Sequence, residues 1–361
     1  MPVADAAFVK SAATPILTTS LQPDVRPSTG NTTFQVRPRS TPKTGSKTFT
    51  NPIIPPASAD PWVITHQGAY YYCESRNQNS IWIRKSERLT EIGAEEGVQI
   101  WSAPQLGANS NAIWAPELHH VNGRWYIYYA ADDGLNENHR MWVLESITDD
   151  PMGGYRCKGQ VDTQGWAIDG TILHHNGELY FLWSGWPGAV NGRQNIYIAP
   201  MSNPWTVRGE RTLLATPEHA WETHEMAICE GPQILQRHGK LFVIYSASGS
   251  WTTEYCLGML EYKGGNICEA ASWKKWEAPV LKRNARVWGV GHCSFTQSPD
   301  GTEDWILFHA KTRKKSGWND RNVHAQRFTW TEAGEPFFGD PIPAGIKMPL
   351  PTGTFPAPVA A

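Results

Sequence analysis

Apolar stretches occur in pairs along this chain, and a short polar turn that ends in glycine separates the members of each pair. Val63 and its neighbours are followed by Gln67-Gly68 and then by the tyrosines at 70–72. The same arrangement recurs around four further turns, Asn122-Gly123, Asn176-Gly177, His238-Gly239 and Asp300-Gly301. Two apolar runs joined by such a turn are typical of a β-hairpin. The pattern therefore predicts five β-hairpins.

The hairpins recur at nearly constant spacing. Their first apolar anchors are Val63, Leu118, Ile172, Ile234 and Phe295, which are separated by 55, 54, 62 and 61 residues. A small sheet of this kind cannot bury its faces alone, so repeated copies stack around an axis as the blades of a β-propeller. We therefore expect an all-β fold, a five-bladed β-propeller. Third strands are predicted at 80–86, 141–146, 195–199, 255–260 and 322–328.

The repeat also sets the expected domain bounds. Residues 51–345 are expected to form one propeller domain. Residues 1–50 are rich in Ser, Thr, Pro and Ala and lack apolar periodicity, which predicts a low-complexity tail or a strap over the propeller. Residues 346–361 are expected to be a C-terminal tail.

The first strand of each blade is expected to be the innermost, so the residues that open these strands should meet at one end of the axis. These entrance residues are Asp60, Ala115, Asp169, Glu230 with Gly231, and His292. Three acids and a histidine from four blades would then share one small area. The competing interpretation is that Asp60 and Asp169 only bond backbone N–H groups in turns.

Converging acids suit one kind of chemistry. Two carboxyl groups can divide acid and base work when their surroundings separate their pKa values, and a third acid nearby helps to separate them. Hydrolysis of a glycosidic bond uses such a pair, one to protonate the leaving oxygen and one to activate water or attack carbon.

The composition argues against several other classes of function. The formal net charge of −2 gives no broad basic field for nucleic acid or for an anionic membrane surface. No apolar run reaches the roughly 18 residues that a membrane span needs. No stretch resembles a secretory signal, so the chain as written is expected in the cytoplasm, or outside the cell if a signal precedes it. Six cysteines without a C-x-x-C pair disfavour a zinc site, and Cys229 and Cys293 are expected to be buried small hydrophobes.

An ordered series of short motifs carries a family resemblance. The motifs are Ala59-Asp60-Pro61, Trp114-Ala115-Pro116-Glu117, Ile168-Asp169-Gly170, Glu230-Gly231-Pro232 and Gly291-His292. Together, from about residue 55 to 335, they resemble glycoside hydrolase family 43, whose members are five-bladed propellers that hydrolyse arabinosides and xylosides with inversion. The resemblance implies that Asp60 is the general base, that Glu230 is the general acid, and that Asp169 raises the pKa of the acid and orients it.

The resemblance also implies neighbours for these acids. His292 would lie near the axis below the sugar, where relatives hold a calcium or other ion through water; no other cofactor is implied. Arg321 is similar to an arginine that contacts substrate. Trp62 and Trp114 flank entrance residues and would wall the substrate site, with core packing as the competing explanation.

The Trp-Ala-Pro-Glu-Leu-His form at 114–119 is most similar to exo-acting α-L-arabinofuranosidases. The expected function is therefore removal of α-L-arabinofuranosyl residues from arabinan- or arabinoxylan-type hemicellulose, with an oligo- or polysaccharide as the partner. A β-D-xylosidase or an endo-arabinanase on the same fold is the alternative. A propeller that binds a glycan or a protein without catalysis is a further one.

Overall fold

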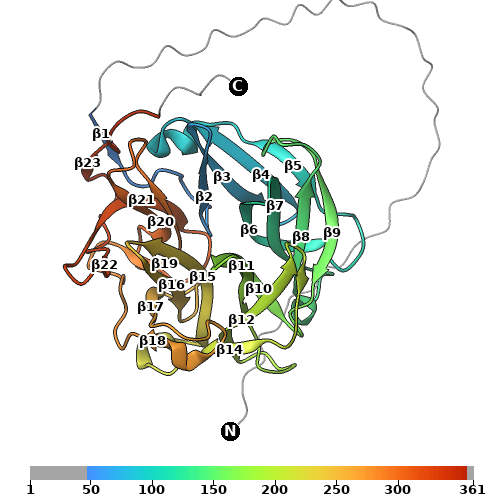
Figure 1. Ribbon diagram of the computed structural model, residues 1–361. Coiled ribbons are helices and arrows are strands. Elements are labelled where there is room, and N and C mark those ends of the chain that lie inside the picture. The colour runs from blue at the N-terminus through green and yellow to red at the C-terminus, as the bar shows by residue number, and fades with distance from the viewer. Residues whose placement is uncertain (1–46, 356–361) are drawn as a thin grey trace, which may run out of the picture. The chain divides into compact units, whose positions relative to one another are not determined.

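Five small antiparallel sheets surround a common centre in the computed structural model, which describes residues 47–355 (Figure 1). The innermost strands are β2, β6, β10, β15 and β19, and the sheets extend outward from them in chain order. A short parallel pairing of Arg193 with Ala227 links the third and fourth sheets. The expected five-bladed β-propeller is confirmed.

Blades 1 to 5 follow the chain in order. Blade 1 comprises β2 (Trp62–His66), β3 (Ala69–Arg76), β4 (Ser80–Ser86) and β5 (Val98–Ser102). Blade 2 comprises β6 (Asn111–Val121), β7 (Arg124–Asp132), β8 (Arg140–Ser146) and β9 (Tyr155–Val161). Blade 3 comprises β10 (Ala167–His175), β11 (Glu178–Gly185), β12 (Arg193–Asn203), β13 (Thr206–Val207) and β14 (Thr212–Ala215).

Blade 4 comprises β15 (Ala227–Arg237), β16 (Lys240–Ala247), β17 (Cys256–Tyr262) and β18 (Trp273–Lys275). Blade 5 comprises β19 (Trp288–Gln297), β20 (Asp304–Lys311), β21 (Arg321–Trp330) and β22 (Pro336–Phe337). The described helices are short 3₁₀ turns, η1 (Leu89–Ala94), η2 (Asn136–Asn138), η3 (Ala220–Glu222) and η4 (Ala270–Ser272). Within residues 47–355, no helix has the length and apolar character to cross a bilayer.

The hairpin turns have the geometry that their residues favour. Gln67 and Gly68 have φ of 43° and 74°, and His238 and Gly239 have φ of 53° and 74°. Positive φ at both central positions defines a type I′ turn, whose twist matches that of the flanking strands. These turns fix the register of the first and second strands, with Arg237 paired to Lys240.

The core lies between the blades. Each of five clusters of buried apolar side chains joins two consecutive blades, as Tyr128 of β7 and Phe181 of β11 do. Second strands such as β7 are therefore covered on both faces, which explains why their sequence is an unbroken apolar run. All six cysteines are free, and Cys229 and Cys293 are buried as expected.

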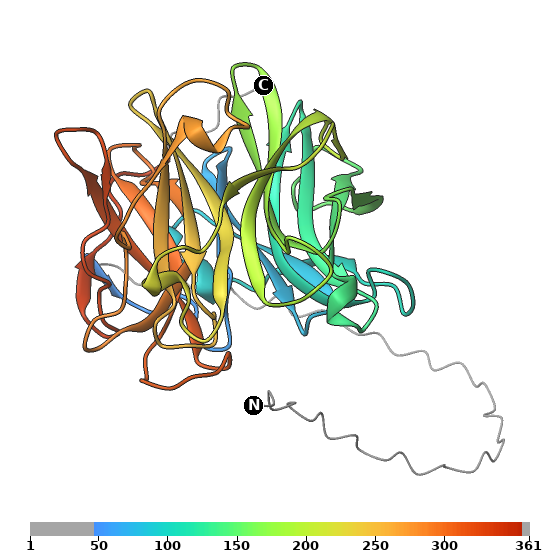
Figure 2. The ribbon, with the colours of Figure 1, turned by 90° about the horizontal axis from the view of Figure 1, so that it is seen from below.

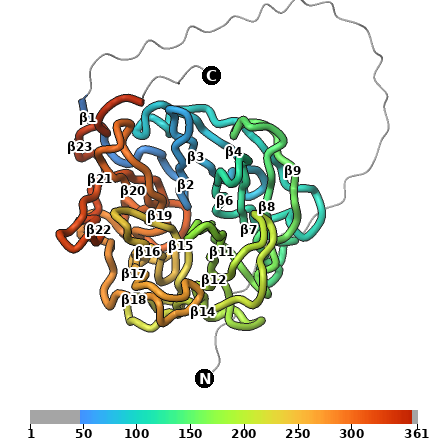
Figure 3. The backbone as a smooth tube through the Cα atoms, viewed as in Figure 1, coloured from blue at the N-terminus to red at the C-terminus, as the bar shows by residue number. Residues whose placement is uncertain are grey.

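The ring closes through the N-terminal part of the described chain. The backbone N–H of Ile53 donates to Val323 O of blade 5 at 2.8 Å, and the Asn51 side chain bonds both backbone groups of Ala325 at 3.1 and 2.9 Å. Further out, β1 (Thr48–Thr50) pairs with β23 (Lys347–Pro349), and the two lie side by side at one edge in Figure 3.

Paired strands thus lie outside the expected bounds of 51 and 345, in ranges assigned above to the tails. Strands this short give no periodic signal in the sequence, since their pairing depends on residues about 300 positions away. Residues 1–46 and 356–361, the remainder of the two expected tails, lie outside the described residues.

Candidate active site

The inner strands keep regular register near the hairpin turns and lose it at their entrances. Register shifts occur in β6, β10, β15 and β19, for example between Ile168 and Thr171. The entrance residues have left-handed φ, with 52° at Asp60, 42° at Ala115, 56° at Asp169, 55° at Gly231 and 46° at His292. Figure 2 shows the strands of the blades from another side, running from one end of the blades to the other. In β15, the entrance residue Glu230 and the turn-end residue Arg237 lie toward opposite ends of the strand. The repeat therefore places one bent residue of each blade at the same end of the propeller.

Left-handed backbone is costly for a residue with a Cβ, by roughly 1–2 kcal/mol. Four of the five entrance residues are not glycine, so the surrounding structure imposes this conformation. Such positions concentrate at functional sites, because the bend turns a side chain out of the normal strand alternation. At Asp60, Asp169 and His292 the bent residue is itself polar.

Blade 4 is built differently. Its left-handed residue is Gly231, so Glu230 stands one position earlier, in extended backbone paired to Ser246. A Cβ at position 231 would lie 3.2 Å from Nδ1 of His292. Glycine thus relieves the strain of positive φ and leaves room for the close approach of His292 beside Glu230.

Asp60 is surrounded by basic groups. Arg321 Nη1 donates to Asp60 Oδ1 at 3.3 Å, and His292 Nδ1 lies 3.3 Å from the same oxygen. Burial alone would raise the pKa of Asp60, but His292, Arg321 and His309 together hold it well below its usual range. The Asp60 side chain is 24% exposed, which leaves it open to solvent. Asp60 is therefore an ionised, accessible carboxylate, as a general base must be.

Glu230 and Asp169 lie deeper, with 7% and 5% exposure. Asp169 Oδ2 accepts a hydrogen bond from the backbone N–H of Gly231 at 3.0 Å, so it is attached directly next to Glu230. The pKa of Glu230 is raised to about 7: burial is the main cause and the nearby charge of Asp60 adds to it, while the hydrogen bond from Tyr255 and the charge of Arg321 oppose it. Burial likewise raises the pKa of Asp169, and Glu230 adds to it.

The three acids therefore differ in charge. At neutral pH the Asp169–Glu230 pair retains a proton that an ordinary carboxyl would have lost, while Asp60 stays ionised. Two carboxyl groups with pKa values driven apart by their surroundings are the signature of divided acid and base roles.

Arg321 lies among these residues, as the resemblance implied. It opens β21, and its backbone N–H and Nε both donate to Trp318 O at 3.3 Å, which ties its position to the preceding loop. Its guanidinium bonds Asp60 from blade 5, across the joint between the last and first blades.

Trp114 and Trp62, the two tryptophans expected at the site, have different surroundings. Trp114 is half-buried, stacks on the His139 ring at 4.1 Å between centroids, and donates from Nε1 to Gln78 Oε1 at 3.2 Å. Trp62 instead donates from its indole to Leu118 O at 2.8 Å and packs on His119.

Trp62 lines a hollow of about 530 Å³ that also includes Thr65, Ile172 and Gly301, residues toward the hairpin turns. The described contacts of Trp62 are thus with blade 2 and this hollow, and its expected contact with substrate stays a prediction.

Two residues that contact the acids could not be predicted from their positions in the repeat. Tyr255 Oη donates to Glu230 Oε1 at 2.8 Å, and His309 Nδ1 lies 3.2 Å from the backbone N of Asp60. Tyr255 stands just before a third strand and His309 lies in a second strand, so neither occupies an entrance position. Only the three-dimensional stacking of neighbouring blades brings them to the acids.

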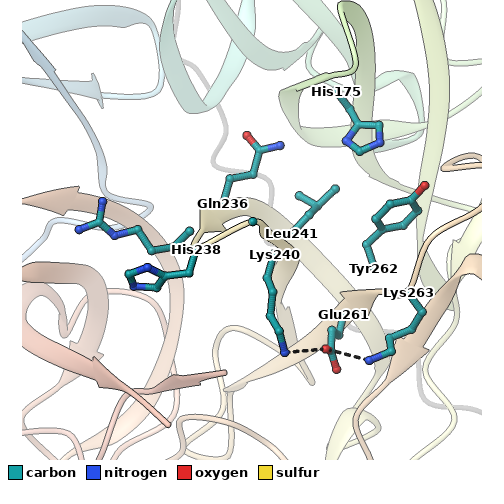
Figure 4. Close-up of a pocket in the computed structure, with 10 residues that line it drawn as sticks. His175, Gln236, His238, Lys240, Leu241, Glu261, Tyr262 and Lys263 are labelled. Atoms are coloured by element: carbon teal, nitrogen blue, oxygen red, sulfur yellow. Dashed lines mark hydrogen bonds and ion pairs between the residues drawn. The ribbon is translucent and has the colours of Figure 1, made fainter. Parts of the chain in front are cut away.

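A separate groove of about 610 Å³ lies at the turn end of blade 4, and Figure 4 shows its residues. Lys240 and Lys263 both contact Glu261, at 3.4 and 3.0 Å, so their charge is already shared with an acid. Strand β15 separates this groove from Glu230, which lies at its other end. Across residues 47–355, no group of three or more His, Cys, Asp or Glu side chains is arranged to hold a metal ion.

A propeller that gathers an ionised carboxylate and a protonated carboxyl group at one end of its axis has the groups that glycoside hydrolysis requires. Comparison with known families agrees with this class. The chain belongs to the glycosyl hydrolases family 43, whose sequence profile matches residues 49–336.

Several individual proteins that are similar to this chain are named as arabinofuranosidases. An extracellular exo-α-(1→5)-L-arabinofuranosidase of Streptomyces avermitilis is 35% identical over 319 residues, which cover 84% of this chain and 66% of that protein. The enzyme of the same name from Streptomyces chartreusis is 34% identical and is covered over 84% of its length. The crystal structure of an α-L-arabinofuranosidase from Lactobacillus brevis superimposes with a TM-score of 0.78 at 34% identity, covering 82% of this chain and 98% of that one. The chain thus spans just under two thirds of the Streptomyces avermitilis relative.

Proposed function

We propose that this protein is an inverting α-L-arabinofuranosidase that removes terminal arabinofuranosyl residues from arabinan- or arabinoxylan-type chains. The observation that carries the proposal is the contrast between Asp60, ionised beside Arg321, and Glu230, buried with a raised pKa. The sugar is inferred from the names of the relatives that share 34–35% of their residues with this chain.

The proposed reaction uses the two carboxyl groups in one step. Asp60 takes a proton from a water molecule, whose oxygen forms a bond to the anomeric carbon. The glycosidic bond breaks, and Glu230 gives its proton to the leaving oxygen. The step ends with Asp60 protonated and Glu230 ionised, and exchange with solvent restores both.

Asp169 and Arg321 have supporting roles in this proposal. Asp169 shares its buried environment with Glu230, and ionisation of both carboxyl groups is disfavoured, so Asp169 helps to keep a proton on the pair. Its bond to Gly231 also fixes the backbone from which Glu230 extends. Arg321 keeps Asp60 ionised and orients it. Trp114, half-buried above blade 2, is proposed to contact the sugar.

An ion held through water beside His292 also remains a proposal. The described residues supply no cluster for direct coordination, so no step of the reaction is assigned to an ion. Dialysis against a chelator, followed by calcium addition, tests this point; recovery of activity only with the added ion would support it, and unchanged activity would refute it.

Hydrolysis of an aryl α-L-arabinofuranoside, measured beside an aryl β-D-xyloside and arabinan oligomers, tests the function. We expect arabinose release by the parent protein and almost none by Asp60→Asn. Release of xylose alone would identify a β-D-xylosidase, and internal cleavage of arabinan would identify an endo-acting enzyme. No release from any of these substrates would contradict the proposed function and would favour a propeller that only binds.

A further inference from the structure

Tyr255 is the uncharged side chain that bonds Glu230. Its hydroxyl donates to Glu230 Oε1 at 2.8 Å, and the whole residue is buried. The ring packs closely against Gly291, where an added Cβ would come within 2.2 Å of Tyr255 Cε1. This close packing restricts the ring and helps to direct its hydroxyl toward the acid.

Tyr255 also packs on His309. The two rings stack with centroids 5.4 Å apart and planes 11° apart, and His309 is fully buried. Gly291 and His309 are directly paired across β19 and β20, so both contacts come from one short piece of blade 5.

His309 in turn bonds the base. The backbone N–H of Asp60 donates to His309 Nδ1 at 3.2 Å, and Asp60 Oδ1 lies 3.3 Å from the same nitrogen. Burial lowers the pKa of His309 to about 3, so the ring is neutral at neutral pH.

We propose that Tyr255 and His309 form a stacked pair of positioning residues that joins the acid to the base across three blades. Tyr255 holds the Glu230 carboxyl group, His309 holds the strained backbone of Asp60, and the contact between the rings fixes the distance between them. This inference deepens the proposed function and rests on it, since it assigns a role only if Glu230 and Asp60 work as acid and base.

The pair also affects the pKa of Glu230. The groups that face Glu230 are Asp60 and Asp169, which disfavour its ionised form, and Arg321 and Tyr255, which favour it. Burial raises the pKa of Tyr255 well above its usual value, so its hydroxyl remains a donor throughout the working range. Removing that donor destabilises ionised Glu230 and therefore raises the pKa of the acid.

The first test is the pH dependence of kcat/KM for Tyr255→Phe, which keeps the ring and removes the hydroxyl. The alkaline limb reports loss of the proton from Glu230. We expect this limb to move upward by roughly one pH unit, the size expected for one lost hydrogen bond to a carboxylate. Tyr245→Phe is the matched control in the same blade, since its hydroxyl bonds Glu222 instead. An unmoved limb in Tyr255→Phe would overturn the proposal.

The second test separates the two functions of His309. His309→Asn keeps an acceptor near the position of Nδ1, while His309→Phe keeps a stacking ring without an acceptor. We expect kcat to fall about tenfold more in His309→Phe than in His309→Asn, as the loss of one buried hydrogen bond would produce. Equal losses in two variants with unchanged thermal melting would contradict a role in holding Asp60.

A measurement without substrate separates failure of this inference from failure of the proposed function. Titration of the Glu230 carboxyl group by ¹³C NMR of glutamate-labelled protein, assigned with Glu230→Gln, gives its pKa in the parent and in Tyr255→Phe. A higher pKa in the variant supports the pair even if arabinosides are not hydrolysed. Identical titrations would overturn the pair while leaving arabinosidase activity as it stands.

Discussion

The two ends of the inner strands use the same repeat in opposite ways. At the turn end, residues such as Gln67 and Asn122 adopt left-handed backbone in two-residue turns that face solvent, and the strands beside them pair regularly. At the entrance end, left-handed residues lie inside the protein, the register shifts, and the exposed fraction of Asp169 falls to 5%. The turn end fixes the fold, and the entrance end holds strained polar residues that the fold must support.

At the entrance end, blade 4 differs from blades 1 and 3. In blades 1 and 3 the acid is itself the left-handed residue, but in blade 4 glycine takes that position and the acid precedes it. Glu230 therefore keeps extended backbone, whereas Asp60 and Asp169 stand at the bend, and of the three acids Asp60 is the one that reaches solvent. This difference of one position fits the proposed roles of Glu230 as a protonated acid and of Asp60 as an ionised base.

The largest expected effect comes from an acid at the entrance end. Asp60→Asn removes the group that accepts a proton from water, so we expect kcat to fall by about 10²- to 10⁴-fold on every substrate. Asp300→Asn makes the same chemical change in the exposed turn of blade 5 and should leave kcat within about twofold of the parent. Steady-state kinetics of the two variants checks this prediction. An equal loss of kcat in both would contradict the contrast between the two ends of the inner strands.

A pair of glycine variants separates strain from function. Gly231→Ala and Gly239→Ala both force an alanine to positive φ, at 55° and 74°, and each should lower the free energy of unfolding by roughly 1–2 kcal/mol. Only the first should also lower kcat, by about tenfold or more, because a Cβ at 231 approaches His292 and displaces Glu230. Urea unfolding and kinetics measured together check this, and equal kcat in the two variants would refute the distinction.

A smaller effect is expected in the pH profile of Asp169→Asn. The alkaline limb of kcat/KM falls where protonated Glu230 is lost, so it lies near the raised pKa of about 7. Removing the Asp169 charge favours the ionised form of Glu230, which lowers its pKa and moves the limb to lower pH. The direction is opposite to that expected for Tyr255→Phe. A limb that moved upward in Asp169→Asn would contradict the proposed role of Asp169.

The smallest effect is expected at the turn-end groove. Lys240→Ala leaves Glu261 with its contact to Lys263, so stability should change by less than about 1 kcal/mol and kcat/KM should not change. Loss of activity on arabinan oligomers, with activity on aryl arabinosides retained, would show that the groove takes part in polysaccharide binding.

Much of the fold is readable from the sequence, because each hairpin has an apolar anchor, a turn glycine and a buried second strand that local rules recognise. Asp60, Asp169 and His292 were also predictable, since equivalent positions of repeats converge by symmetry. Tyr255 and His309 were not, because their contacts arise between blades and no repeat position marks them. Trp62 was proposed from its nearness to Asp60 in sequence, and the contacts that fix its ring, to Leu118 and His119, could not be read from the sequence.

The division of work between Glu230 and Asp60 is the central claim, and a leaving-group series on Glu230→Gln tests it most directly. A variant without its general acid still cleaves bonds whose leaving group needs no proton. We predict that Glu230→Gln hydrolyses a dinitrophenyl α-L-arabinofuranoside at a rate close to that of the parent, but loses about 10²- to 10⁴-fold on arabinan oligomers. A uniform loss across the series would contradict the assignment of Glu230 as the acid.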